Sequence, residues 1–168
     1  MTGTGLRQAK TYDSGGDAPK LAVVYGSGKP GEQRVGLRFR NLGIPQGATI
    51  DSAVLEVSPS RTLSDPVTLR IYGESVGDAE PFDTSKQSLK EKFTRKTSTS
   101  VAWPMTAEWV ARGRQGQAQR APDRSAILQD VVGRDDWCGG NDLVLLMEKA
   151  DGTGWRSVYS HDGKPDFA

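Results

Sequence analysis

The only histidine of the chain lies in the stretch Ser160-His161-Asp162, which contains the three residue types of a nucleophilic triad. A triad is assembled in space, and neighbours on an extended chain point to opposite sides, so adjacency in sequence does not bring the three side chains together. We therefore interpret this stretch as an exposed turn. One histidine and one cysteine, Cys138, also leave no ligand set for zinc and no internal disulfide.

A second pattern, Gly26-x-Gly28-x-x-Gly31, follows an apolar run and has the glycine spacing of a dinucleotide-binding loop. Such a loop needs a helix that begins inside the pattern, because the helix amides hold the pyrophosphate. Lys29-Pro30 and the alternating residues that begin near Gln33 argue against that helix. We predict a hairpin loop instead.

Carboxylates are the next candidates for chemistry. Asp135-Asp136 are neighbours in sequence, whereas glycoside hydrolysis needs two carboxyl groups that face each other across a cleft. We assign no catalytic residue and predict that the chain is not an enzyme and needs no organic cofactor. Structural calcium fits better, since it takes hard oxygen ligands from loops, and its candidate ligands are Asp13, Asp17 and Asp78. Their spacing is not that of an EF-hand, and ordinary polar loops remain the alternative.

Tryptophan rings supply the last candidate site, because an exposed planar ring can stack on a sugar. Trp103 and Trp137 flank apolar segments and are expected in the core. Trp109 and Trp155 are the better candidates for exposure and ligand contact, with packing as the alternative for both.

Short strands must position these residues. Apolar and polar residues alternate over Val35–Arg40 and again over Ile50–Val57, and the loop between them contains Pro45. Period-2 alternation on both sides of such a loop predicts an antiparallel pair. Further strands are predicted at residues 10–12, 21–25, 67–72, 100–103, 143–147 and 155–159, the last two joined as a hairpin by Asp151-Gly152.

One helix is predicted at residues 123–133, since Pro122-Asp123 can start it and Gly133 can end it. Residues 73–99 are polar and charged, and most of them are expected in surface loop, with one helical turn as a further option. The strand at residues 143–147 is apolar on both faces and should lie at the centre of a sheet. The expected core consists of Leu37, Phe39, Leu55, Leu69, Ile71, Leu145 and Met147, with Ile127, Leu128 and Val131 of the helix packed on the sheet.

The composition agrees with many short strands in one domain. The chain has 168 residues, 20 glycines, 9 prolines and a net charge of +1. Glycine-rich and proline-rich chains without alternating strands and helices favour an all-β fold, here an antiparallel β-sandwich with jelly-roll-like connections and one short helix. We expect residues 1–20 to form a polar N-terminal segment and residues 21–168 to form the sandwich. The charge balance gives no reason to expect nucleic acid, no run is long enough to span a membrane, and the first residues do not resemble a signal peptide.

The order of motifs resembles a jelly-roll-like module of large secreted and surface proteins of bacteria, over roughly residues 20–162. The most specific phrase is Ile44-Pro-Gln-Gly-Ala-Thr-Ile50, with further matches at Val35–Phe39, Leu69–Glu74 and Asn141–Leu145. Such modules resemble carbohydrate-binding and adhesive accessory domains, which are usually not catalytic. The resemblance implies a non-catalytic, extracellular or cell-surface module for adhesion or structure in a larger protein. The alternative is a carbohydrate-binding module of a secreted enzyme, and no binding residue is carried over.

One departure from that pattern concerns the partner. In the module a final apolar strand normally follows the Tyr-Ser-His-Asp-Gly region, whereas this chain ends at Asp166-Phe167-Ala168. A missing strand would leave unpaired backbone groups at a sheet edge, which can accept an added strand. We therefore expect either a strand from another chain or domain beside Trp155–Tyr159 or a neighbouring strand, or closure of the sheet by residues 9–12 or 21–25. A glycan or a protein surface is the expected ligand.

Overall fold

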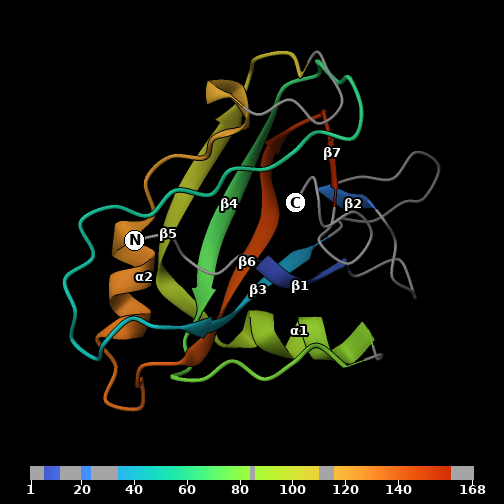
Figure 1. Cartoon of the computed structure of the whole chain (residues 1–168). Coiled ribbons are helices and arrows are strands. Elements are labelled where there is room, and N and C mark those ends of the chain that lie inside the picture. The colour runs from blue at the N-terminus through green and yellow to red at the C-terminus, as the bar shows by residue number, and fades with distance from the viewer. Residues whose placement is uncertain (1–5, 12–19, 24–33, 84–85, 110–115, 160–168) are drawn as a thin grey trace.

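The structure is a computed structural model that describes residues 6–11, 20–23, 34–83, 86–109 and 116–159. Its elements run through this part of the chain in the order shown in Figure 1. The strands are β1 (Leu6–Thr11), β2 (Lys20–Val23), β3 (Val35–Leu42), β4 (Val67–Glu74), β5 (Lys96–Met105), β6 (Asn141–Gly152) and β7 (Arg156–Tyr159). The helices are α1 (Lys86–Thr94), the short 3-10 helix η1 (Gln117–Gln119) and α2 (Ser125–Val132).

The main feature is a five-stranded sheet with the strand order β1-β3-β6-β4-β5, in which every neighbouring pair is antiparallel. The central position of β6 agrees with its apolar sequence and confirms that prediction. A mostly antiparallel β fold is therefore confirmed. The helix predicted at residues 123–133 is also confirmed, as α2.

The inner face of this sheet carries the main core. Leu69 and Ile71 of β4 and Leu145 of β6 are buried there against Ile127 and Val131 of α2. Leu37, Leu55 and Met147 are buried as predicted, whereas Phe39 and Leu128 are only partly buried at the margin of this core. The predicted core faces of the strands are thus correct.

The outer face of the sheet is covered in part by a helix that is longer than the single turn considered from the sequence. Residues 86–94 form α1, whose Leu89 and Phe93 lie one turn apart and pack with Phe82 on Val144 and Leu146 of β6. Gly36 permits this approach, because a Cβ atom there would lie 2.5 Å from the Phe82 ring. The expectation of a long surface loop over residues 73–99 is therefore wrong.

The predicted pairing of Val35–Arg40 with Ile50–Val57 is also wrong. β3 pairs with β1 and β6, and residues 50–57 form no strand, with a single bridge from Glu56 to Arg120. The segment is nevertheless extended and directs Leu55 into the core, and its backbone is bonded from Ala121 N to Leu55 O over 2.9 Å. The alternation of this segment therefore reflects one buried side. An extended segment can have such a side without pairing in a sheet.

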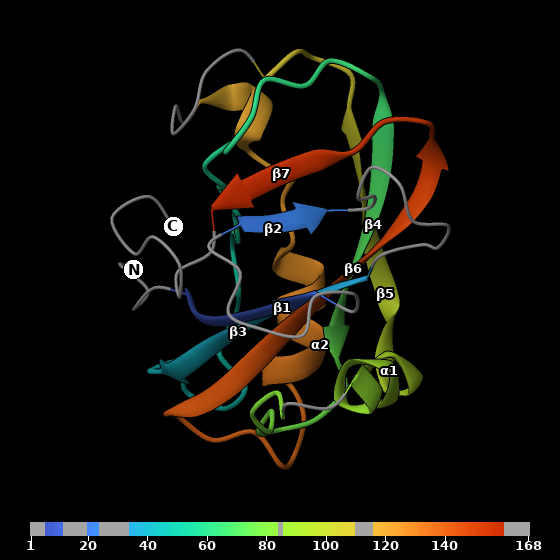
Figure 2. The same cartoon turned by 90° about the vertical axis from the view of Figure 1, so that its right-hand side faces the viewer.

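The hairpin predicted between β6 and β7 does not form. Gly152 adopts a φ of +90° and Gly154 lies close to Asp65, and the chain then leaves the main sheet. β7 pairs with β2 on one side, as Figure 2 shows. On its other side β7 bonds residues 58–60, through Tyr159 N to Ser58 O (2.9 Å) and Ser60 N to Ser157 O (2.8 Å). The edge expected to be vacant beside Trp155–Tyr159 is therefore filled by this chain. Closure by the run predicted at residues 21–25 is confirmed for its described part, residues 21–23, which belong to β2.

β5 is longer than predicted, because it continues through Pro104. It is an edge strand of the main sheet, where proline is tolerated. At its other end the register with β4 shifts between Tyr72 and Glu74. There Gly73 N donates to Thr97 Oγ1 (3.0 Å), and Thr97 Oγ1 donates to Thr99 O (2.8 Å). The hydroxyl thus bridges a ladder position that the bulge has opened.

Candidate functional site

The outer face of the sheet is polar where α1 does not cover it. Five residues from three strands and the segment before β3 meet there, and we call them the ladder surface: Arg34, Arg70, Tyr72, Lys96 and Glu148. Arg70 and Glu148 are direct cross-strand partners, and side chains opposite each other in this way interact across a sheet. Arg70 is exposed and Tyr72 is half-buried.

Charge pairing organises the ladder surface around one carboxylate. Glu148 makes ion pairs with Arg34 (3.2 Å) and with Lys96 (2.9 Å), and the Lys96 ammonium lies 4.1 Å from the centroid of the Tyr72 ring. The hydrogen bond to Glu148 raises the pKa of Lys96 above its ordinary value of 10.5. Partial burial acts to raise the pKa of Glu148, but hydrogen bonds from Lys96 and Tyr72 and the charges of Lys96 and Arg34 outweigh it, so the net shift is downward. The arrangement has an excess of cations and of hydrogen-bond donors.

Glu148→Gln should lower the free energy of unfolding by about 0.5–1 kcal/mol at neutral pH, as expected for a partly exposed ion pair. Because the folded-state pKa of Glu148 lies below its ordinary 4.5, its contribution is present above that value and disappears as the pH falls through the folded-state pKa. Urea unfolding of both proteins along a descending pH series should therefore give converging stabilities in acid. The control is Glu56→Gln, which breaks an exposed pair with Arg120 and leaves Glu148 in place. This variant should lose stability in acid as the wild type does. Parallel curves for wild type and Glu148→Gln would contradict the assignment.

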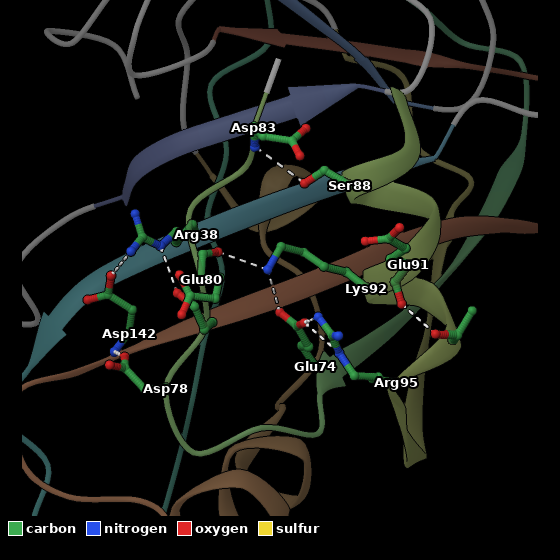
Figure 3. Close-up of polar contacts among 12 residues, drawn as sticks. Arg38, Glu74, Asp78, Glu80, Asp83, Ser88, Glu91, Lys92, Arg95 and Asp142 are labelled. Carbon is green, nitrogen blue, oxygen red and sulfur yellow. Dashed lines mark hydrogen bonds and ion pairs between the residues drawn. The ribbon is translucent and has the colours of Figure 1, made fainter. Parts of the chain in front are cut away.

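A second cluster lies between α1 and the sheet (Figure 3). Glu74 at the end of β4 is buried and accepts from Lys92 (3.0 Å), which is also buried, and from Arg95 (2.8 Å). Lys92 donates in addition to the carbonyl oxygen of Glu80 (2.8 Å). With both of its oxygens bonded to cations, the carboxylate fixes the C-terminal end of α1 on the sheet.

The region of the predicted calcium ligand Asp78 is also internally bonded. Its Oδ1 accepts from Asp142 N (2.8 Å), and Asp142 itself pairs with the Arg38 guanidinium (Figure 3). Asp142 is thus already paired with a guanidinium, whereas the calcium assignment of Asp78 itself stays a prediction. Asp13 and Asp17 lie outside the described residues. Within the described ranges no group of three or more histidine, cysteine, aspartate or glutamate residues could hold a metal ion.

The two predicted ligand-binding tryptophans differ. Trp109 is fully buried, its Nε1 donates to Ala118 O (3.0 Å), and the Arg156 guanidinium lies 5.3 Å from its ring centroid. The expectation that Trp109 is exposed is therefore wrong. Trp155 is half-buried, with the Arg61 guanidinium 5.8 Å from its ring centroid, so part of one tryptophan remains accessible.

Sequence reasoning found only part of the ladder surface. The strand predicted at residues 67–72 has alternating residues, and this pattern accounts for the outward position of Arg70 alone. Tyr72, Lys96, Arg34 and Glu148 were missed, because their convergence depends on β6 lying between β3 and β4. Ser160-His161-Asp162 and the glycine loop at residues 26–31 lie outside the described residues.

The site belongs to a mostly antiparallel β protein with two α-helices in its described part. No family model, no curated protein and no solved structure matches the chain. Among the described residues, no helix is both long and apolar enough to cross a bilayer.

Proposed function

We propose that this chain is a non-catalytic extracellular module that serves adhesion or structure within a larger surface or secreted protein, and that the ladder surface is its contact face. The carrying observation is the ladder surface itself, where Arg34 and Lys96 surround one carboxylate beside the exposed Arg70. Such a surface suits hydroxyl-rich or anionic groups of a partner, because a guanidinium group donates hydrogen bonds in a fixed fork and an ammonium group adds rotatable donors and a positive charge.

The rigidity of the scaffold supports recognition in place of chemistry. Glu74 and Asp142, in the two clusters of Figure 3, are each tied to a cation and to strands or helices of the frame. A recognition face gains affinity when it is held in one geometry before binding, since less conformational freedom is then lost.

The same proposal includes a finer description of the fold as a jelly-roll-like sandwich. Its support is a second layer over the inner face of the main sheet, made of the β2–β7 pair and residues 58–60, with isolated bridges at Glu56–Arg120 and Leu63–Trp109. Val158 and Leu55 of this layer are buried in the main core. A sandwich requires this kind of facing layer.

Carbohydrate binding as part of a secreted enzyme is the second candidate, and Trp155 is the observation that favours it. A half-buried ring with a guanidinium beside it is a common partner for a sugar face. In the described part of the chain, however, Val54 is the exposed large hydrophobic residue, and the Tyr72 ring lies beneath Lys96. These features support polar contact more than stacking.

The test is a binding screen of the purified chain against arrayed glycans and immobilised extracellular matrix proteins. We expect a bound probe whose affinity falls at least about tenfold in the variant that combines Arg70→Ala with Lys96→Ala, and falls with added salt, because exposed charges are screened. Trp155→Ala is the matched variant. If it alone abolishes binding, the carbohydrate-stacking alternative holds.

The non-catalytic assignment is tested separately with His161→Ala. If the wild-type chain turns over a glycoside or ester substrate and this variant does not, the module is an enzyme and the proposal fails.

A further inference from the structure

The described part of the main sheet ends at β5 with no strand beyond it. Between Lys96 and Met105 this edge carries no charge, and its residues Ser98 and Ala102 are exposed. Natural edge strands are usually kept apart by charges, proline or bulges. Here such devices stand only at the two ends, as Lys96 with the bulge and as Pro104, which leaves the middle of the strand able to pair.

The backbone groups that point away from β4 can be assigned. The hydroxyl of Thr97 connects Gly73 N with Thr99 O, so Thr99 directs its carbonyl group toward β4. Alternation along the ladder then directs Val101 and Trp103 toward β4 as well, and directs the N–H and C=O groups of Ser98, Ser100 and Ala102 to the open side. Pro104 falls in the outward set, where its missing N–H breaks no bond to β4.

We propose that this edge pairs with β5 of a second copy of the chain, antiparallel and centred on Ser100. In that register Ser98 lies opposite Ala102 of the partner, and the outward groups of Ser98, Ser100 and Ala102 in the two copies form about six hydrogen bonds without using Pro104 N. The side chains of Thr99 and Val101, both half-buried, meet across the two-fold axis. Lys96 lies opposite Pro104, so no like charges are brought together. The pairing joins two five-stranded sheets into one.

The structure of the β5 edge indicates that its partner is a second copy of the same chain. An antiparallel edge is complementary to itself under a two-fold axis, which is the commonest symmetry of protein dimers. α2 does not supply the missing partner, because it packs on the inner face, where Ile127 and Val131 lie against Gly73 of β4. The inference does not depend on the proposed function, because it uses backbone groups of Ser98, Ser100 and Ala102, although this edge adjoins the ladder surface at Lys96 and Arg70.

A charge exchange across the axis tests the register. Sedimentation equilibrium of the wild type from micromolar to millimolar concentration should show a monomer–dimer equilibrium. Ser98→Asp with Ala102→Asp places carboxylates opposite each other twice and should raise the dissociation constant roughly tenfold or more. Ser98→Lys with Ala102→Asp places opposite charges together and should restore it to within about threefold of wild type or make it tighter. Thr49→Asp with Ser52→Asp, on an exposed segment away from the edge, is the charge-matched control and should dimerise as the wild type does.

Circular dichroism should show that all four proteins are folded, because the changed side chains are exposed. The proposal is overturned if the wild type remains monomeric at millimolar concentration. It is also overturned if the two edge variants behave alike, since the dimer would then use another surface or the edge would serve a strand of a different protein.

Discussion

Replacing Glu74 by alanine should lower the free energy of unfolding by about 3–5 kcal/mol, which is among the largest effects expected for a single substitution in this chain. The Glu74 side chain is 0% exposed and that of its partner Lys92 is 3% exposed, so the substitution leaves an ammonium group buried without its counter-charge. Arg95 is 49% exposed and can turn into the solvent, so most of the penalty falls on Lys92. The measurement is urea unfolding followed by circular dichroism.

A second variant separates loss of the ion pair from general damage. Glu74→Leu with Lys92→Met removes both charges and should recover most of the stability lost in Glu74→Ala, because replacing a buried pair by apolar residues is often neutral. Glu56→Ala, which breaks the exposed pair with Arg120, should change the stability by less than about 1 kcal/mol. Equal losses in the single and double variants would show that Glu74 acts through packing and not through charge.

Trp109→Ala should destabilise the fold by about 3–5 kcal/mol, as expected when a large buried aromatic side chain leaves a cavity. The ring is fully buried, and its centroid lies 6.5 Å from that of the Trp103 ring. The Arg156 guanidinium lies beside it, and its Nε1 donates a hydrogen bond to Ala118 O. Arg156 would also be affected, because its guanidinium is buried beside this ring, and burial lowers its pKa below the ordinary value. Thermal and urea unfolding would both register the change.

Trp155→Ala is the matched control for this substitution. Its ring is half-buried, so the stability loss should be clearly smaller than for Trp109→Ala. If Trp109→Ala leaves the stability intact and instead removes ligand binding, the ring is a contact residue and the burial described above is not the working state of the protein.

The local patterns of the sequence predicted the strands well and their partners poorly. The alternation of Leu69 and Ile71 with polar residues predicted both β4 and its buried face, and the apolar run at residues 143–147 predicted the central strand. Alternation reports which side of a segment is buried, but it does not say what lies on either side in the sheet. The pairing of β3 with β6, across about a hundred residues, therefore lay beyond it.

Two errors share a second physical cause. Lys86–Thr94 has few apolar residues, and Leu89 and Phe93 alone do not make a stripe that stands out from a polar surface loop. Trp109 lies between segments of mixed polarity, and its burial depends on η1 and Arg156 closing over it. The helix at residues 86–94 and the Trp109 ring are both buried only after distant parts of the chain have met, so composition and spacing did not predict either.

The position of β6 has a consequence for the order in which the chain can fold. β3 and β4 both pair with β6 and not with each other, although β6 is formed by residues 141–152, near the end of the described chain. During synthesis, the β1–β3 pair and the β4–β5 pair must therefore wait as separate halves, each with the edge that will pair with β6 still open. Such edges invite wrong pairing, and contacts of large sequence separation slow folding. We expect folding to be limited by insertion of β6 and nascent chains that stop before residue 141 to depend on chaperones.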